Sequence, residues 1–392
     1  GTLPMCIEGK SLGIKKVIVP KENALEASIV KGIEVIGVNS LKETVNYLNK
    51  NNLQPIYSNW EEIAEKAEKY NVDFSEVKGQ ENVKRAVEVA AAGAHNCLCI
   101  GPPGSRKTMI AKRIPTILPD LSFEEALEVT KIHSISGMLS KDVPIIINRP
   151  FRAPHHTISP KSLIGGGLIP KPGEVSLSHY GILFLDELTE FNRSTLEVLR
   201  GPLEDGIVTI SRVNSIFTYP CKFMFVASMN PCPCGYYGSK EKECTCTEQA
   251  IAKYIGKISG PLLDRIDIQV EVNGIKYEKL ESSNNIETSK NIQKRVNLAR
   301  IIQRERYKNE NIFSNSELTP KLIEKYCKID EESKKILQIA FEKLGLSARA
   351  YGRILKVART IADLGNSKDI RKNHIAEAIQ YRSLDKKYWK AR

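Results

Sequence analysis

The octapeptide GPPGSRKT, which runs from Gly101 to Thr108, contains the residue types that hold a phosphate group. In the phosphate-loop pattern G-x-x-x-x-G-K-[ST], backbone N–H groups and a lysine surround the phosphates, and a hydroxyl faces Mg²⁺. The sequence matches this pattern at Gly101, Lys107 and Thr108. At the position of the second glycine it has Arg106 instead. The predicted nucleotide site consists of Gly101, Pro102, Pro103, Gly104, Ser105, Arg106, Lys107 and Thr108.

Arg106 is the one departure from this pattern, and it affects how well the loop can bind a nucleotide. Glycine at that position lets the backbone approach the phosphates closely, whereas any Cβ intrudes there. The misfit costs about a few kcal/mol of nucleotide affinity, of which a guanidinium beside the phosphates recovers a part. We expect Arg106 to impair nucleotide binding and hydrolysis.

Two acidic residues, Asp186 and Glu187, follow the apolar stretch ILFL. Such a stretch predicts a buried strand, and ligands of open α/β sheets bind at the carboxyl ends of strands. With Thr108 upstream, we expect Asp186 to hold Mg²⁺ through water and Glu187 to orient the attacking water. The alternative is a pair of solvated acids. Asn230 ends another apolar stretch, where it either positions the same water or begins a turn before Pro231.

Four of the nine cysteines form two Cys-x-Cys pairs with nine residues between them, and they are Cys232, Cys234, Cys244 and Cys246. Two close pairs suit a tetrahedral thiolate site for a structural Zn²⁺, and four reduced thiols in a loop are the alternative. The remaining thiols are scattered: Cys6, Cys97, Cys99, Cys221 and Cys327. An odd count without a recognisable export signal predicts a cytoplasmic protein.

Two segments carry residues suited to nucleic acid, because basic groups contact phosphates and an aromatic ring stacks on a base. The first segment contains Phe151, Arg152, His155, His156 and Lys161, and the second is a predicted hairpin with Arg212. Packing of these loops between subunits is the alternative. The two histidines could instead bind a metal, but adjacent side chains point apart in an extended segment.

The composition is that of an ordinary globular protein. The 392 residues are 41% hydrophobic and 27% charged, and we find no apolar run of about 18 residues that would predict a membrane span. The formal net charge of +12 favours a polyanionic partner, usually nucleic acid. A lysine-rich surface without such a partner is the alternative.

Three apolar stretches, at 96–100, 182–187 and 222–230, alternate with helical patterns, which predicts an α/β fold with a parallel sheet and helices on both faces. The first strand, the glycine-rich loop and the helical spacing after it supply the context that a phosphate loop requires. Residues 140–178 form a long irregular segment, and such segments are usually functional. After about residue 288 the pattern is entirely helical and predicts a separate helical domain.

These features together resemble the AAA+ ATPases and, more narrowly, the magnesium-chelatase-like ComM/YifB family. The motifs that carry the resemblance are DFSEVKGQ, RPFRAPHHTISPKSLIGGG, PKPGEVSLSHYGILFLDE, MNPCPCGYYG, SGPLLDRID and LSARAYGRILKVARTIADL. The resemblance implies part of a Lon-like (S5-like) domain at 1–50, a linker at 51–72, an ATPase core at 73–273, a second linker at 274–290 and a helical lid at 291–392. The stretch that would hold a Lon-type nucleophilic serine is not in this sequence, so we do not expect a protease.

The resemblance also implies roles for three further residues. Asn230 matches the first sensor, Arg265 matches the arginine finger that acts on ATP in a neighbouring subunit, and Arg349 matches the second sensor of the lid. For either arginine, an ordinary salt bridge is the alternative, and Arg353 and Arg359 lie close to Arg349 in sequence.

The function that the resemblance implies is an ATP- and Mg²⁺-dependent hexameric DNA motor, a branch-migration helicase in recombination during natural transformation. A protein-remodelling chaperone of the magnesium-chelatase type is the second hypothesis. The third is a nucleotide-dead binding module, which rests on Arg106.

Overall fold

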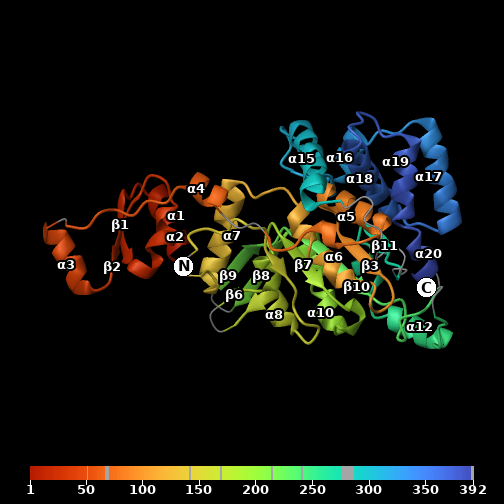
Figure 1. Cartoon of the computed structure of the whole chain (residues 1–392), viewed down its shortest axis with the longest axis horizontal. Coiled ribbons are helices and arrows are strands. Elements are labelled where there is room, and N and C mark those ends of the chain that lie inside the picture. Colours follow the sequence, from red (N-terminus) through yellow and green to blue (C-terminus); the bar gives the residue numbers. More distant parts are fainter. Residues whose placement is uncertain are drawn as a thin grey trace.

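The computed structural model of the chain describes residues 1–50, 52–66, 70–140, 143–167, 170–212, 215–239, 242–274 and 287–389. A small N-terminal unit, a central α/β core and a group of C-terminal helices follow one another along the molecule (Figure 1). Among the described residues, every helix is too short or too polar to cross a lipid bilayer.

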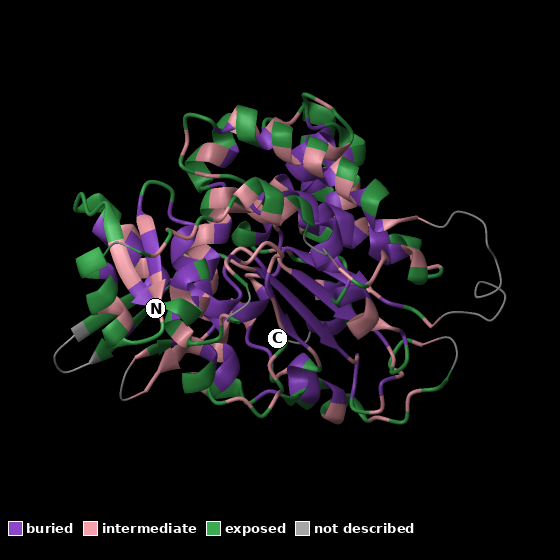
Figure 2. Ribbon diagram, turned by 60° about the vertical axis from the view of Figure 1, so that its left-hand side comes forward, coloured by how far each residue is buried: buried purple, intermediate pink, exposed green. Residues whose placement is uncertain are grey.

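The core is built on a sheet of five strands that are all parallel, in the order β11-β3-β10-β7-β4. The strands are β3 (Cys97–Ile100), β4 (Phe151–Arg152), β7 (Ile182–Leu185), β10 (Met224–Met229) and β11 (Ile268–Glu271). The three central strands are buried along their whole length, and the sheet lies in the buried centre of the molecule (Figure 2). The predicted parallel sheet is thus confirmed, and its apolar runs follow from being covered on both faces.

Alternate residues of each strand contribute to two different hydrophobic cores. Cys97 and Cys99 of β3 pack with helix α5 (Glu81–Gly93), whereas Leu98 and Ile100 pack with the helices of the opposite face. The helices of that opposite face are α8 (Pro160–Ile164), α9 (Glu174–Leu177), α10 (Arg193–Glu197), α11 (Arg200–Asp205), α12 (Glu248–Ile255) and α13 (Gly260–Leu263). The period of two along a strand therefore gives a layered α/β/α arrangement.

The N-terminal unit has a two-stranded parallel sheet and three helices. Its elements are α1 (Thr2–Ser11), β1 (Lys16–Pro20), α2 (Ala24–Ser28), β2 (Glu34–Val38) and α3 (Leu41–Lys50). The unit packs against α7 (Phe123–Ser136), where the buried Glu26 carboxylate accepts hydrogen bonds from the Ser134 hydroxyl and from the first N–H groups of α1. Helix α1 and the connector helix α4 (Trp60–Lys66) were not predicted.

The irregular segment 140–178 contains several very short elements, and the predicted hairpin follows further along the chain. The segment holds β4, α8, the paired strands β5 (Gly165–Gly166) and β6 (Lys171–Pro172), and α9. The hairpin consists of β8 (Ile207–Arg212) and β9 (Ser215–Pro220). Its turn, at residues 213–214, lies outside the described residues.

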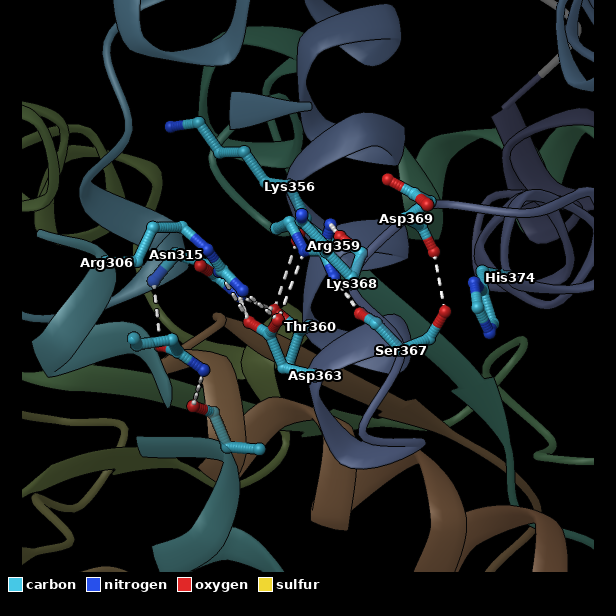
Figure 3. Close-up of polar contacts among 12 residues, drawn as sticks. Arg306, Asn315, Lys356, Arg359, Thr360, Asp363, Ser367, Lys368, Asp369 and His374 are labelled. Carbon is cyan, nitrogen blue, oxygen red and sulfur yellow. Dashed lines mark hydrogen bonds and ion pairs between the residues drawn. The ribbon is translucent and has the colours of Figure 1, made fainter. Parts of the chain in front are cut away.

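All but the last of the C-terminal helices share a hydrophobic core with α5 and the sheet, and the last packs in the core of the opposite face. The C-terminal helices therefore have no separate core of their own among the described residues, unlike the separate helical domain that the sequence predicts. They are α15 (Ser289–Arg306), α16 (Pro320–Tyr326), α17 (Glu331–Leu344), α18 (Ala348–Leu364), α19 (Lys372–Gln380) and α20 (Leu384–Trp389). Within this group the buried Asp363 of α18 accepts hydrogen bonds from Arg306, Arg359 and Asn315 (Figure 3).

Candidate functional site

The phosphate loop connects the carboxyl end of β3 to helix α6 (Lys107–Ala111). The Gly101 N–H donates to the Met229 carbonyl at 3.2 Å, and a Cβ on Gly101 would collide with the Val272 carbonyl oxygen. Glycine is therefore required where the loop passes between two strand ends. Gly104 has φ +76, a left-handed conformation that glycine adopts without strain.

Arg106 also adopts the left-handed conformation, with φ 66 and ψ 24, and stands directly before α6. A residue with a Cβ loses roughly 1–2 kcal/mol in this region. The backbone at position 106 thus has the geometry for which the phosphate-loop pattern uses glycine, while the half-buried arginine side chain adds bulk beside the loop. Impaired nucleotide binding stays a prediction.

Lys107 holds its amine at the centre of the loop. Its Nζ donates to the carbonyl oxygens of Gly101 and Pro102 at 2.8 and 2.9 Å, and to Oδ1 of Asn230 at 3.2 Å. Burial lowers the pKa of this amine, and the Asp186 carboxylate acts in the opposite direction. Two residues predicted for the site, Lys107 and Asn230, are therefore in direct contact.

The Thr108 hydroxyl and the Asp186 carboxylate also meet, at 2.6 Å from Oγ1 to Oδ2. The other carboxylate oxygen accepts a hydrogen bond from Ser228, a fully buried residue of β10. Ser228 was not predicted, and the signal available was a hydroxyl near the end of an otherwise apolar strand. A hydroxyl and an oriented carboxylate form a donor set that suits Mg²⁺, which prefers oxygen ligands.

Glu187 follows Asp186 at the carboxyl end of β7 and is exposed. Its backbone is left-handed, with φ 52, and its N–H donates to Oδ1 of Asp186 at 3.1 Å. A glutamate in this conformation is unusual, and such strain is concentrated at functional sites.

The two arginines that the family resemblance singles out lie elsewhere. Arg265 pairs with Glu204 and donates to the Arg200 carbonyl at 3.1 Å. Its guanidinium borders an open cavity of about 420 Å³ lined by Glu197, Val198, Arg200, Gly201, Glu204 and Arg265. Arg349 has a 71% exposed side chain and pairs with Asp264 at 3.1 Å. In the described part of the chain, neither arginine contacts the phosphate loop.

The four clustered cysteines converge in space. The Sγ atoms of Cys232, Cys234, Cys244 and Cys246 all lie within 4.8 Å of one another. The Sγ of Cys232 is 3.3 Å from that of Cys234 and 3.7 Å from that of Cys244. Two Cys-x-Cys pairs that meet in this way present four sulfur donors to one point, as a tetrahedral zinc site does.

Backbone N–H groups donate hydrogen bonds to two of these sulfurs. The N–H of Cys234 donates to Sγ of Cys246 at 3.4 Å, and the N–H of Tyr237 donates to Sγ of Cys232 at 3.3 Å. The N–H of Tyr236 lowers the pKa of the Cys234 thiol to about 6. The N–H of Cys246 acts to lower the pKa of the Cys244 thiol, but burial and the neighbouring thiols outweigh it and raise this pKa to about 12, and the pKa of Cys246 is raised as well. Thiolates are the metal-binding form of cysteine, so the donor set fits Zn²⁺.

Several residues predicted to contact DNA are engaged within the chain. Phe151 stacks on Phe184 with 5.8 Å between ring centroids, and Arg152 forms a two-point ion pair with Glu174 at 2.6 and 2.8 Å. Arg152 therefore already has a charge partner, and the ring of Phe151 packs against the core.

Four other DNA candidates remain, and one expectation about them was wrong. The rings of His155 and His156 lie 4.0 Å apart rather than pointing away from each other, because the chain leaves its extended conformation there and enters a turn. Lys161 is exposed on α8. Arg212 ends β8, and its side chain lies outside the described residues.

Comparison with known proteins adds evidence from sequence. Residues 73–280 match the family model described as magnesium chelatase, subunit ChlI, and residues 286–382 match that of the ChlI C-terminal region. The chain is 41% identical to the competence protein ComM of Haemophilus influenzae over 377 residues, which cover 94% of this chain and 72% of that protein.

Two further relatives match this chain, one as similar in sequence as ComM and one less similar. The uncharacterised protein YifB of Escherichia coli is 41% identical over 376 residues, covering 95% of this chain and 72% of YifB. The magnesium-chelatase 38 kDa subunit of Cereibacter sphaeroides is 22% identical over 216 residues, covering 51% of this chain and 58% of the subunit.

Proposed function

This chain belongs to the magnesium chelatase ChlI family of AAA+ proteins, and on that premise we propose that it is an ATP-driven motor that moves DNA. One observation carries the ATPase part: Lys107, Thr108, Asp186 and Asn230 meet at the carboxyl edge of a parallel sheet, through contacts of 2.6–3.2 Å. This edge is where open α/β sheets bind their ligands.

Each of these side chains takes a defined part in hydrolysis. Lys107 binds the outer phosphates and Asn230 fixes the lysine and the attacking water, while Glu187 accepts the proton of that water. Thr108 and Asp186 hold Mg²⁺, which when bound neutralises the charge of the phosphates. Ser228 keeps the Asp186 carboxylate in place.

Hydrolysis in a ring explains the position of Arg265. This arginine pairs with Glu204 beside an open cavity instead of facing its own phosphate loop. In a hexameric ring it reaches the ATP of the neighbouring subunit and stabilises the charge of the transferring phosphoryl group. Arg349, which is exposed on α18, acts as the second sensor.

DNA is the partner that the charge favours. The chain carries a net charge of +12, and its relative from Haemophilus influenzae is named a competence protein. We propose branch migration of recombination intermediates as the activity. Lys161, His155, His156 and Arg212 are the proposed contacts, and Arg152 and Phe151 support them from within.

A labelled branched DNA tests this function. We expect binding that weakens steeply with salt, because phosphate contacts release counterions, and strand displacement that needs ATP. A Lys161→Ala variant should weaken binding while its ATPase rate without DNA is kept. No binding at low salt would reject the DNA motor and leave protein remodelling as the second hypothesis.

The cysteine cluster, in our proposal, holds a structural Zn²⁺ with all four positions filled by protein sulfurs. Metal analysis of protein purified without added zinc should find one zinc per chain, and a Cys246→Ser variant should retain less. A metal-free protein in which all four thiols react freely would contradict this. The Cys221→Ser variant is the control, because Cys221 is buried elsewhere.

A further inference from the structure

The cysteine cluster begins two residues after Asn230, a residue of the candidate nucleotide site. We call the segments 232–239 and 242–246, which carry the four thiols, the cysteine loop. Its first ligand, Cys232, is fully buried against the core of the sheet. The cluster is therefore attached directly to the strand end that supplies Asn230.

The cysteine loop also touches the phosphate loop, at Gly235. The Gly235 N–H donates to the Cys232 carbonyl at 3.0 Å, which closes a tight turn between two of the thiols, and φ is +87. A Cβ on Gly235 would collide with Cδ of Pro103 and lie 2.9 Å from its Cγ. Only glycine allows the two loops to approach this closely.

The other side of the cysteine loop rests on α20. The Tyr237 ring meets the Tyr388 ring edge-on at 6.1 Å between centroids, and the Gly238 backbone faces the end of the Lys387 side chain. Both Lys387 and Tyr388 bind Glu271 at the end of β11, at 2.6 and 3.1 Å. The cysteine loop is thus held between a fixed helix and the phosphate loop.

We propose that a metal ion on the four thiols positions the phosphate loop through the contact between Gly235 and Pro103, so that metal and nucleotide bind with positive cooperativity. This rests on the nucleotide and zinc sites proposed above. A bound ion fixes Cys232 and Cys234, and with them the turn that carries Gly235. Without the ion, nothing holds the four thiols at one point. The turn that carries Gly235 is then no longer fixed and no longer supports Pro103.

A Gly235→Ala variant tests the contact. We expect about tenfold weaker binding of a fluorescent ATP analogue, a size typical of coupling between sites, with one zinc per chain retained. Gly238→Ala is the matched control, because Gly238 lies in the same segment with φ +74 but faces only the Lys387 side chain. It should bind the analogue within about twofold of the parent. Parental affinity in Gly235→Ala would overturn the proposal.

Removing the Pro103 ring should relieve the collision. In a Pro103→Ala background, adding Gly235→Ala should change the nucleotide Kd little, because the ring atoms that the new methyl meets are gone. A double-mutant cycle measures this coupling. Full additivity of the two substitutions would contradict a direct contact.

Reciprocity gives a second measurement that does not depend on substitutions. If zinc tightens nucleotide binding by some factor, nucleotide must tighten zinc binding by the same factor. We expect a zinc-chelating dye to extract the metal less readily when the ATP analogue is saturating. Equal extraction with and without the analogue would overturn the proposal.

The possible failures are distinguishable. If neither the natural chain nor Arg106→Gly binds the analogue, the proposed ATPase function is wrong, and this coupling is wrong with it. If the purified protein binds no zinc at all, the metal site is wrong. If both ligands bind but neither affects the other, the coupling alone is refuted.

Discussion

Arg106 and Lys107 are neighbours with opposite consequences for a nucleotide. Lys107 has its amine held among four oxygen atoms around the loop, and it exchanges some of these contacts for phosphate oxygens when a nucleotide binds. Arg106 holds its backbone in a conformation that costs energy for any residue with a Cβ. The same two positions thus combine a well-positioned ligand group with local strain.

Replacing Arg106 by glycine should remove that strain. We expect Arg106→Gly to raise the free energy of unfolding by about 1 kcal/mol and to bind a fluorescent ATP analogue at least about tenfold more tightly, because the backbone then approaches the phosphates. Urea unfolding and a binding titration check the two effects.

Ala94→Gly is the control for this substitution. Ala94 is also left-handed, with φ 55, but it ends α5 and is not part of the phosphate loop. The Ala94→Gly variant should be more stable than the natural chain but should bind the ATP analogue with the same affinity. Equal analogue affinities for the natural chain and Arg106→Gly would show that the arginine does no harm.

Glu187→Gln should separate binding from hydrolysis. Glutamine keeps the size of the side chain but cannot accept the proton of water, so we expect the ATPase rate to fall by about 100-fold or more, while analogue affinity is retained. A colorimetric phosphate assay, run in the natural chain and in the Arg106→Gly background, measures the rate. An unchanged rate would remove Glu187 from the mechanism.

At this scale, sequence patterns located the central residues of the site but not their partners. Lys107, Thr108 and Asp186 follow from local motifs, because the spacing in the loop and the strand end determine where they lie. Ser228 could not be found in that way, because its role depends on two strands being adjacent in the sheet. The ion pair of Arg152 with Glu174 likewise joins residues whose proximity only the tertiary fold creates.

Helix α18 is joined to the turn that carries Arg265 by two ion pairs of unequal environment. Arg349 reaches Asp264 from an exposed position, whereas Arg353 reaches the buried Asp267 at 2.5 Å. An exposed ion pair contributes little to the free energy of unfolding because water screens the two charges. A buried charge that loses its partner costs much more.

Asp267→Asn and Asp264→Asn should therefore differ in stability. We expect Asp267→Asn to lower the free energy of unfolding by about 3 kcal/mol, because Arg353 loses the carboxylate that neutralises its charge. Asp264→Asn should cost less than about 1 kcal/mol. Urea unfolding measures the stability that each variant loses. Equal losses for the two variants would contradict this account of the ion pairs of α18.

His95 makes the stability of the contact between α18 and this turn sensitive to acid. It is fully buried between Asp267 and Thr360, at 3.3 and 2.7 Å, and burial lowers its pKa, with Lys356 and Arg300 acting in the same direction and Asp267 opposing them. The folded protein keeps the ring neutral, while the unfolded chain binds a proton below about pH 6.5. Stability is thus complete above that pH and declines as the pH falls.

We expect the free energy of unfolding to decrease between about pH 6.5 and pH 5, with a slope of up to about 1.4 kcal/mol per pH unit from this one group. Burial also lowers the pKa of His133 and His374, which add to the slope. A His95→Gln variant, measured by urea unfolding at several pH values, should have a shallower dependence. An identical slope would show that His95 becomes protonated without cost.

Among the elements, the predictions succeeded where the pattern was strong. The strands β3, β7 and β10 are continuous apolar runs because both their faces are covered. Helix α1 was missed because its amphipathic pattern is weak, and its first N–H groups are satisfied by Glu26 from a distant helix. Helix α6 is shorter than its spacing suggests, since the chain continues into a 3₁₀ turn that contains Pro115.

For the whole molecule, the ring is the central expectation. Arg265→Ala should lose hydrolysis although its own phosphate loop is intact, because in the proposed ring this arginine acts on the ATP of the neighbouring subunit. Mixing Arg265→Ala with Glu187→Gln should restore part of the ATPase activity, since some interfaces then pair an intact Glu187 with an intact Arg265. Size measurements with and without nucleotide should accompany the assay, and no recovery in assembled rings would exclude action between subunits.

The arrangement of domains was the least predictable level. The sequence changes composition near residue 274, which suggests a separate helical region. However, α15 and α18 pack on α5, and Val89 of α5 shares one hydrophobic core with Val357 of α18. Composition marks where a chain changes character, but it does not reveal which surfaces are buried against each other.

This shared core limits how relatives can be recombined. The ring of His95, the Thr360 hydroxyl and the absence of a Cβ at Gly93 fit one another, since a methyl at Gly93 would meet both side chains. A chimaera that takes residues 287–389 from another family member must therefore bring matching residues at the end of α5. Exchange at the boundary of the two family models would divide one hydrophobic core between two parent sequences.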